Sequence, residues 1–252
     1  MNLFDLAGQK AIVTGGGGGL GGGMAEALAE HGAEVLIIDM MDSAKVIADQ
    51  LAASGFMAHA LVADLSTRER VEKAFDDALS ILGGRVDILV NAAGIIRRHK
   101  CEDFPIEDWE AVININLTTV FSLSQLAGRI MLKNGYGKII NIASMLSYFG
   151  GYTVPSYAAS KGGVAQLTKA LANEWAGRGV HVNAIAPGYM ATDMNTKLVN
   201  DPGRNHEILS RIPAGRWGQP EDMKGVVVFL ASHASDYLDG AIIPVDGGYL
   251  GR

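Results

Sequence analysis

Short apolar runs alternate along the chain with segments in which apolar residues recur at helical spacing. The runs predict strands at 10–14, 34–38, 57–62, 86–90, 138–143, 180–186 and 241–245, and the periodic segments predict helices at 21–31, 42–53, 66–82, 107–133, 156–176 and 220–231. Because most runs are continuously apolar, they are typical of a parallel sheet that helices cover on both faces. Ser66 is the expected N-cap of the third helix. With no internal repeat or linker, the sequence predicts a single α/β domain over residues 1–252, doubly wound around a seven-stranded parallel sheet.

A glycine-rich loop at 14–23 lies between the first predicted strand and the first predicted helix. The N-terminus of a helix offers unpaired N–H groups and a positive dipole end, and glycine lets a phosphate approach the backbone. So many glycines match nearly any glycine spacing, so the position of the loop is more informative than its pattern. A flexible linker is the alternative, but the context favours a dinucleotide phosphate site. The residues expected to bind are Gly15, Gly17, Gly18, Gly19 and Leu20.

Acidic residues at two strand ends bear on the identity of the nucleotide. Asp39 closes the second predicted strand, where a carboxylate can accept hydrogen bonds from ribose hydroxyls and would repel a 2′-phosphate. Residues 15–23 contain no Arg or Lys that could receive such a phosphate. Both features favour NAD over NADP, with a solvated loop aspartate as the alternative. Asp64 and Leu65 end the third strand, and Asp64 is equally suited to contact the adenine amino group or to cap a helix.

Three side chains with proton chemistry are expected to converge. Ser144 follows an apolar run, and Tyr157 and Lys161 are spaced i and i+4, which puts both on one face of a helix. A phenol has a reference pKa of about 10, and an adjacent cation lowers the pKa of a phenol. This pairing would allow proton exchange with a carbonyl or alcohol oxygen. The alternative is that the Tyr-x-x-x-Lys spacing is an accident of an amphipathic helix.

The composition excludes several other classes of protein. The net charge is −6, and Arg97-Arg98 is the only basic cluster, which argues against nucleic acid as a partner. The single Cys101 excludes an internal disulfide and is expected to be an inert thiol, and the six histidines show no metal-ligand spacing. No apolar run is long enough to span a membrane, and the first residues do not resemble a signal peptide. We therefore expect a cytoplasmic protein without a metal.

Several motifs in a fixed order resemble the short-chain dehydrogenase/reductase family across essentially the whole chain. They are Thr14-Gly15-x-x-x-Gly19-x-Gly21, Asn91-Ala92-Ala93-Gly94, Asn116, Ser144, Tyr157-x-x-x-Lys161, and Pro187-Gly188 with Thr192. The resemblance implies a Rossmann-type fold and an NAD-dependent enzyme that interconverts a CH–OH group and a ketone. The family usually has a polar residue among loop positions that are all glycine here, so the phosphate contacts of that side chain are in question.

The resemblance also implies roles for these residues. Tyr157 would be the general acid/base, Ser144 a hydrogen-bond donor to the substrate oxygen, and Lys161 a ligand of the nicotinamide ribose that lowers the pKa of Tyr157. Asn116 would hold a water that relays protons, although pairing with backbone in the interior is the alternative. The remaining cofactor contacts would come from Asn91, Ala92 and Gly94 on the adenosine side and from Pro187, Gly188 and Thr192 at the carboxamide end.

Further blocks resemble members of the family that act on deoxy keto-sugar acids in the bacterial breakdown of pectin- or alginate-type uronic acids. A carboxylate substrate requires a cation, for which Arg97 or Arg98 is preferred over Arg211 and Arg216, with surface roles open for each. The polar stretch 189–211 is expected to form a substrate lid. Met145, Tyr148 and Met190 would border the sugar, and plain packing is the alternative for the two methionines.

The resemblance implies a homotetramer, for which the apolar 226–231 helix and the glycine-rich C-terminus are candidate contacts. Two other functions stay open. One is another sugar-acid or polyol dehydrogenase of the same family, such as a gluconate 5-dehydrogenase. The other is a regulator that binds NAD(H) without catalysis, against which the complete set of proton-transfer residues argues.

Overall fold

The computed structural model describes residues 2–252, and its centre is a parallel sheet of seven strands in the order β3-β2-β1-β4-β5-β6-β7. The strands are β1 (Lys10–Thr14), β2 (Glu34–Asp39), β3 (Ala58–Val62), β4 (Ile88–Asn91), β5 (Gly137–Ile142), β6 (Val180–Pro187) and β7 (Ile242–Val245). The sequence-based prediction of a seven-stranded parallel sheet is confirmed. The chain crosses from one side of β1 to the other at β4, so the carboxyl ends of β1 and β4 form a topological switch point, where ligands of such sheets bind.

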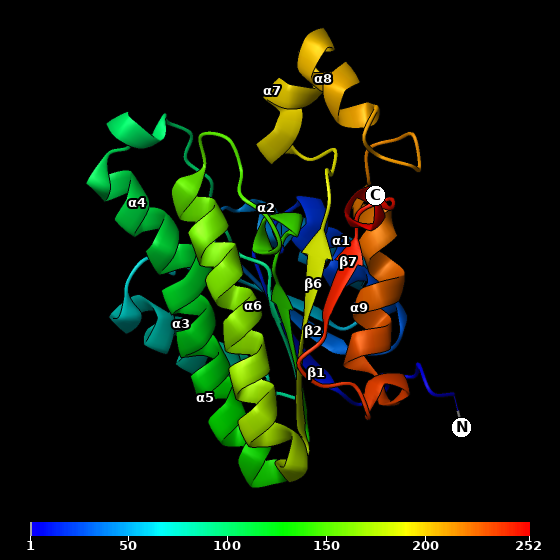
Figure 1. Ribbon diagram of the computed structural model, residues 1–252. Helices are drawn as coiled ribbons and strands as arrows, with labels where there is room; N and C mark the ends of the chain where they lie inside the picture. Colours follow the sequence, from blue (N-terminus) through cyan, green and yellow to red (C-terminus); the bar gives the residue numbers. More distant parts are fainter. Residues whose placement is uncertain (1) are drawn as a thin grey trace.

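Helices cover both faces of this sheet, and two short ones project beyond its carboxyl edge (Figure 1). The α-helices are α1 (Gly19–Glu30), α2 (Ser43–Ala53), α3 (Arg68–Ile81), α4 (Ile106–Ile113), α5 (Thr119–Asn134), α6 (Pro155–Trp175), α7 (Thr196–Val199), α8 (Pro202–Leu209) and α9 (Lys224–Ala231). One buried cluster joins α1, α2 and α9 to the sheet, and a second joins α3, α5 and α6 to its other face. No helix within residues 2–252 is long and apolar enough to cross a membrane.

The central strands owe their place to their uninterrupted apolar sequence. Side chains on both faces of β1 and β4 are inaccessible, as at Ile12, Val13, Leu89 and Val90. Burial of each such side chain contributes about 1.5–3 kcal/mol relative to exposure. The continuous runs therefore specify strands that are buried on both faces.

Several predicted element boundaries are corrected. The expected single helix at 107–133 is α4 and α5 joined by a π-helical segment, Asn114–Thr118. Thr67, not Ser66, is the N-cap of α3, because its side chain accepts a hydrogen bond from the Arg70 N–H.

The apolar face of the 226–231 helix, which we expected at a subunit contact, is largely core, because Val227, Val228 and Leu230 are buried within the chain. The polar stretch 189–211 contains α7 and α8.

Candidate active site

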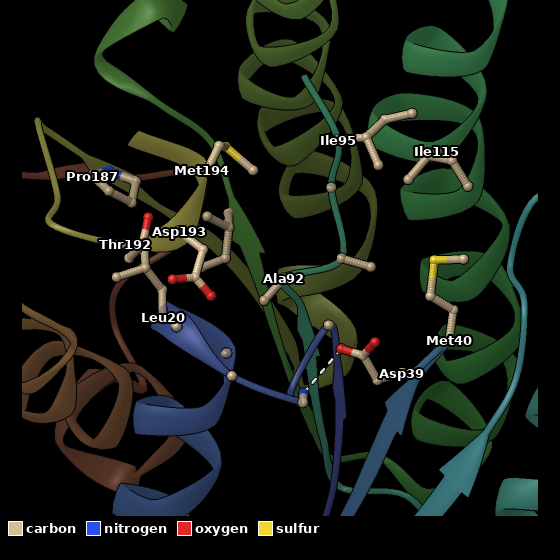
Figure 2. A pocket seen from close by; sticks show the side chains of 18 of the residues that line it. Leu20, Asp39, Met40, Ala92, Ile95, Ile115, Pro187, Thr192, Asp193 and Met194 are labelled. Carbon is tan, nitrogen blue, oxygen red and sulfur yellow. Dashed lines mark hydrogen bonds between the residues drawn. The ribbon is translucent and has the colours of Figure 1, made fainter. Parts of the chain in front are cut away.

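A cavity of about 440 Å³ opens at the carboxyl edge of the sheet, between the glycine loop, the ends of β4 and β5 and the segment after β6. Figure 2 shows Asp39 and Met40 on one side of this cavity, with Pro187, Thr192, Asp193 and Met194 on the opposite side. Most of the predicted site residues line it: Gly15, Gly17, Gly18, Gly19, Leu20, Asp39, Asp64, Leu65, Ala92, Gly94, Ser144, Tyr157, Lys161, Pro187, Gly188, Met190 and Thr192. The sequence thus identifies residues from distant parts of the chain that share one cavity.

The glycine loop leaves the backbone open to this cavity. Gly15 has φ +67°, and a Cβ added there would lie 2.6 Å from the Ala93 Cα, so a larger residue would collide with the neighbouring turn. A Cβ at Gly18 would meet nothing within 4 Å, which leaves this backbone exposed to a ligand. Because α1 begins at Gly19, the N–H groups of its first turn have no partner within the helix. This arrangement fits a pyrophosphate.

Asp39 is held against the glycine loop. Its Oδ2 accepts a hydrogen bond from the Gly17 N–H at 2.9 Å, drawn in Figure 2, and its Oδ1 accepts one from the Met41 N–H at 3.1 Å. A Cβ at Gly17 would lie 2.6 Å from the Ser43 Oγ and 2.9 Å from the Asp39 carboxyl group. The loop and the carboxylate therefore position each other, and Asp39 faces the region where the adenosine half of a dinucleotide would lie.

Two of the expected adenosine contacts are engaged elsewhere. Asp64 lines the cavity, but its carboxylate accepts hydrogen bonds from the N–H and the hydroxyl of Ser66, both at 2.8 Å, and pairs with Arg70. These contacts belong to the turn before α3, whose N-cap is Thr67, so they match neither a helix cap nor a free adenine ligand. The expectation that Asn91 lines the cleft is wrong: this buried amide donates to the Ser124 Oγ at 3.1 Å and to the Asn141 Oδ1 at 2.8 Å.

Ser144, Tyr157 and Lys161 meet at the other end of the cavity. Ser144 follows the end of β5 and begins a short 3₁₀ turn, in which its Oγ accepts a hydrogen bond from the Leu146 N–H at 3.1 Å. Tyr157 lies in the first turn of α6, and the Lys161 Nζ lies 5.6 Å from the centroid of its ring. Lys161 is 4% exposed and donates to the Ile142 carbonyl at 2.5 Å. A strand end and one helix face thus bring a hydroxyl, a phenol and an amine together.

The pKa values in this group correct one expectation. Burial raises the pKa of Tyr157, and a hydrogen bond with Ser144 and the charge of Arg98 only partly oppose that shift. Lys161 was expected to lower the pKa of the phenol, but the Lys161 ammonium is itself desolvated, and burial lowers its own pKa to about 8. Burial therefore dominates the pKa of each side chain, and both tend toward their neutral forms.

Asn116 lies in the π-helical segment and has no exposed surface. Its Oδ1 accepts a hydrogen bond from the Ile95 N–H at 2.8 Å, and its Nδ2 donates to the Ile95 carbonyl at 2.9 Å. The side chain therefore matches the alternative of pairing with backbone, and it fixes the turn after β4. A Cβ at Gly94, on this turn, would lie 3.3 Å from the Asn116 Oδ1, so the glycine permits this close contact.

The four candidate arginines differ in their partners. Arg216 forms two hydrogen bonds of 2.7 Å with Asp222, and the Arg211 guanidinium lies 4.6 Å from the centroid of the Tyr249 ring. Arg97 pairs with Asp108 at 3.2 Å. Within residues 2–252, Arg98 has no ion pair. Partial burial lowers the pKa of Arg98, while the nearby phenols of Tyr157 and Tyr189 oppose that shift and Arg204 adds to it. Arg98 is therefore the candidate whose charge acts on the reacting end of the cavity.

The three residues expected to contact the sugar also differ in their surroundings. Met190 is 3% exposed and lines the cavity. Met145 packs instead in a buried cluster with Ile208, Ile212 and Trp217, so its contacts match plain packing. Tyr148 is half exposed, does not line the cavity, and donates a hydrogen bond to the Ile242 carbonyl at 2.9 Å.

Some lining residues were not singled out from the sequence. They are Met40, Met41, Ile95, Ile115, Asp193, Met194 and Asn195. Met40 and Met41 directly follow Asp39, and residues 193–195 lie within the stretch predicted to be a lid, so position along the chain was a usable signal for both. Ile95 and Ile115 carry no such signal, because an isoleucine is equally typical of the core. Residues 2–252 contain no group of three or more His, Cys, Asp or Glu side chains that could hold a metal.

Comparisons with known proteins agree with this geometry. A family model described as enoyl-(acyl carrier protein) reductase matches residues 16–250. A Bacillus subtilis protein named 2-dehydro-3-deoxy-D-gluconate 5-dehydrogenase is 51% identical over 252 residues, which cover 100% of this chain and 98% of that protein. The chain belongs to the short-chain dehydrogenase/reductase family.

Solved structures of short-chain dehydrogenases superimpose closely on this chain. A Beutenbergia cavernae protein, described as an NAD(P)-dependent gluconate 5-dehydrogenase with NADP bound at low occupancy, is 48% identical, with 100% of both chains covered and a TM-score of 0.96. An Agrobacterium tumefaciens protein, described as a 2-deoxy-D-gluconate 3-dehydrogenase with bound NADP, is also 48% identical over 100% of both chains, with a TM-score of 0.94. This member of the short-chain dehydrogenase/reductase family is thus an oxidoreductase, and the relatives that it resembles are named as dehydrogenases of sugar acids.

Proposed function

We propose that the enzyme uses NAD(H) to interconvert a secondary alcohol and a ketone on a deoxy keto-sugar acid, namely 2-dehydro-3-deoxy-D-gluconate and 2,5-diketo-3-deoxygluconate. The observation that carries this proposal is the convergence of Ser144, Tyr157 and Lys161 on the cavity that Asp39 and the glycine loop line. The substrate is suggested by the name of the Bacillus subtilis relative. The proposal places the enzyme in uronate breakdown.

The proposed chemistry divides between cofactor and chain. The nicotinamide supplies or accepts the hydride when it is bound. In the direction of reduction, Tyr157 gives its proton to the substrate oxygen and Ser144 donates a hydrogen bond to the same oxygen. A raised pKa suits Tyr157 to this role, since the phenol keeps its proton until the oxygen becomes basic. Lys161 would hold the nicotinamide ribose, and Asn116 supports the turn that carries Gly94 rather than relaying protons through its amide.

Asp39 is the proposed reason for a preference for NAD. Its carboxylate accepts hydrogen bonds from two backbone N–H groups and faces the adenosine end, where it would accept from ribose hydroxyls and repel a 2′-phosphate. Among residues 15–23 no cation offsets it. The NADP in the two solved relatives makes the choice testable rather than given. In Asp39→Ser, kcat/KM with NADH should fall and the ratio of NADH to NADPH activity should shrink.

Arg98 is the proposed ligand of the substrate carboxylate, because its charge acts on Tyr157, whereas Arg97 and Arg216 are paired with carboxylates and Arg211 lies over the Tyr249 ring. Residues 189–211 act as the substrate lid, with Met190 at its base. We also propose that residues 1–252 form a single domain, that the assembly is a homotetramer, and that the enzyme is cytoplasmic.

The test is the oxidation of NADH and of NADPH by the purified protein with 2,5-diketo-3-deoxygluconate and with 5-ketogluconate. Rapid turnover of the first ketone with NADH supports the proposal. Preference for 5-ketogluconate would replace it with a gluconate 5-dehydrogenase, the activity in the name of the Beutenbergia cavernae relative. Tyr157→Phe should bind NADH nearly normally and lose turnover. If it turns over at the wild-type rate, the assigned mechanism is wrong. Binding of NADH without turnover of any ketone by the wild type would indicate a regulator.

A further inference from the structure

Asp108, outside the cavity, binds the residues on both sides of Arg98. It lies in the first turn of α4, and its Oδ1 pairs with the Arg97 Nε at 3.2 Å. Its Oδ2 pairs with the His99 Nε2 at 2.7 Å. One carboxylate therefore draws two side chains that are two positions apart in the chain toward the same helix.

The backbone of this segment is fixed as well. The His99 N–H donates to the carbonyl of Thr153 at 3.1 Å, and the His99 ring packs edge-on against Phe104 at a centroid distance of 5.2 Å. Thr153 is the non-glycine residue with positive φ within residues 2–252, at +60°, a costly conformation that the surroundings must hold. It lies just before α6, the helix that carries Tyr157. The segment around Arg98 is thus tied to both α4 and the start of α6.

Asp108 thus anchors the residue before Arg98 and the residue after it, while Arg98 itself forms no ion pair within residues 2–252. The charge of Arg98 acts on the phenols of Tyr157 and Tyr189. The Arg97 guanidinium, by contrast, is engaged by Asp108.

We propose that Asp108 is a positioning residue that orients Arg98 toward a substrate carboxylate beside Tyr157, an inference that rests on the carboxylate-binding role proposed for Arg98. A long guanidinium side chain samples many rotamers in water, and fixing its base reduces that freedom before the substrate binds. Asp108 itself touches neither the substrate nor the reacting atoms. Its loss should therefore weaken binding of the carboxylate while leaving the proton chemistry of Tyr157 in place.

The test compares Asp108→Ala with Arg98→Gln, using 2,5-diketo-3-deoxygluconate and its uncharged amide as substrates. Asp108→Ala should raise the KM of the carboxylate substrate about 10-fold, because small errors in orientation are costly. Its kcat, its KM for the amide and its Kd for NADH should stay within about 3-fold of wild type. In the Arg98→Gln background, Asp108→Ala should have no further effect, since the two residues act through one interaction. Asp108→Asn, which keeps the shape of the side chain, should have a smaller effect.

Glu107→Gln is the matched control, because it removes the same charge from the same turn of α4 at an exposed residue. It should leave every parameter unchanged. If Arg98→Gln raises the KM of the carboxylate substrate and Asp108→Ala does not, the positioning role is wrong and the role of Arg98 stands. If Arg98→Gln affects the acid and the amide equally, the proposed carboxylate site itself fails. Equal effects of Asp108→Ala on both substrates would show a merely structural role and overturn the inference.

Discussion

Two buried lysines lie at opposite ends of the same strand, β5, and their partners differ. Lys138, near the amino end, is fully buried and donates to the Asp236 carboxylate at 2.7 Å and to the Ser235 Oγ at 3.2 Å. Lys161 reaches the carboxyl end from α6, is 4% exposed, and donates only to the neutral carbonyl of Ile142 among residues 2–252. Both lysine side chains are nearly inaccessible, and only the one at the amino end has a carboxylate partner among residues 2–252.

That difference has a physical meaning. Burial lowers the pKa of both lysines, but at Lys138 the hydrogen bond and charge of Asp236 oppose the shift. A buried charge is costly unless it is paired, so a paired lysine can serve the fold alone. Lys161 lacks such a partner and faces the cavity, as expected of a group whose partner arrives with a ligand. Lys138 is therefore paired within the fold, whereas Lys161 stays available to a ligand.

The largest expected effect comes from removing Lys161. Lys161→Met should lower kcat/KM by about 10³-fold, the scale expected when positioning of a proton donor and of the cofactor is lost. Its free energy of unfolding should not fall, and we expect a rise of about 1–3 kcal/mol at pH 7 because an unpaired buried charge is removed. Ketone reduction assays and urea denaturation measure the two quantities.

Lys169→Met is the matched control, because Lys169 lies on the same helix and is exposed. It should change neither the activity nor the stability by a measurable amount. A Lys161→Met protein that is both inactive and clearly less stable would show that Lys161 supports the fold as Lys138 does, and the contrast between the two lysines would not hold.

Breaking the other pair should have the opposite pattern. Asp236→Ala leaves Lys138 buried without a carboxylate, so the free energy of unfolding should fall by about 2–3 kcal/mol, less than for a fully buried pair because the Asp236 side chain is 46% exposed. The kcat/KM of the folded enzyme should stay within about 2-fold, because neither Asp236 nor Lys138 lines the cavity. Urea denaturation and steady-state assays at a temperature where the variant is folded measure both.

A double variant that removes both charges is the control for this pair. In Asp236→Ala combined with Lys138→Met no charge is left buried, so most of the lost stability should return. If the double variant is as unstable as Asp236→Ala alone, loss of packing rather than an unpaired ammonium explains the effect.

Whether a contact can be predicted from the sequence depends on how far apart its two residues lie in the chain. The strands and the convergence of Ser144, Tyr157 and Lys161 follow from local patterns, namely apolar runs and a spacing of four residues. The pairing of Lys138 with Asp236 joins residues that are 98 positions apart, and no local pattern indicates it. The same holds for Asn91, whose motif suggested a cleft contact while its amide bonds with Ser124 and Asn141 inside the core. Local chemistry can nominate a side chain, but only the fold decides whether its groups are already satisfied.

The smallest expected effect is a pH dependence that belongs to Lys161 alone. Its pKa in the folded enzyme is about 8, because burial lowers it from the ordinary lysine value of 10.5. Between these values the unfolded chain binds the proton and the folded chain does not, so stability rises with pH in this window. The destabilisation is fully present below about pH 8 and is lost as the pH approaches 10.5.

From pH 7 to 9.5, the free energy of unfolding of the wild type should rise relative to Lys161→Met by about 2 kcal/mol. Groups common to both proteins cancel in this difference, and at these pH values the Tyr157 phenol, whose pKa is raised, keeps its proton. Urea titrations of both proteins at the two pH values give the difference, and parallel curves would mean that Lys161 keeps an ordinary pKa and needs no ligand to complete its site.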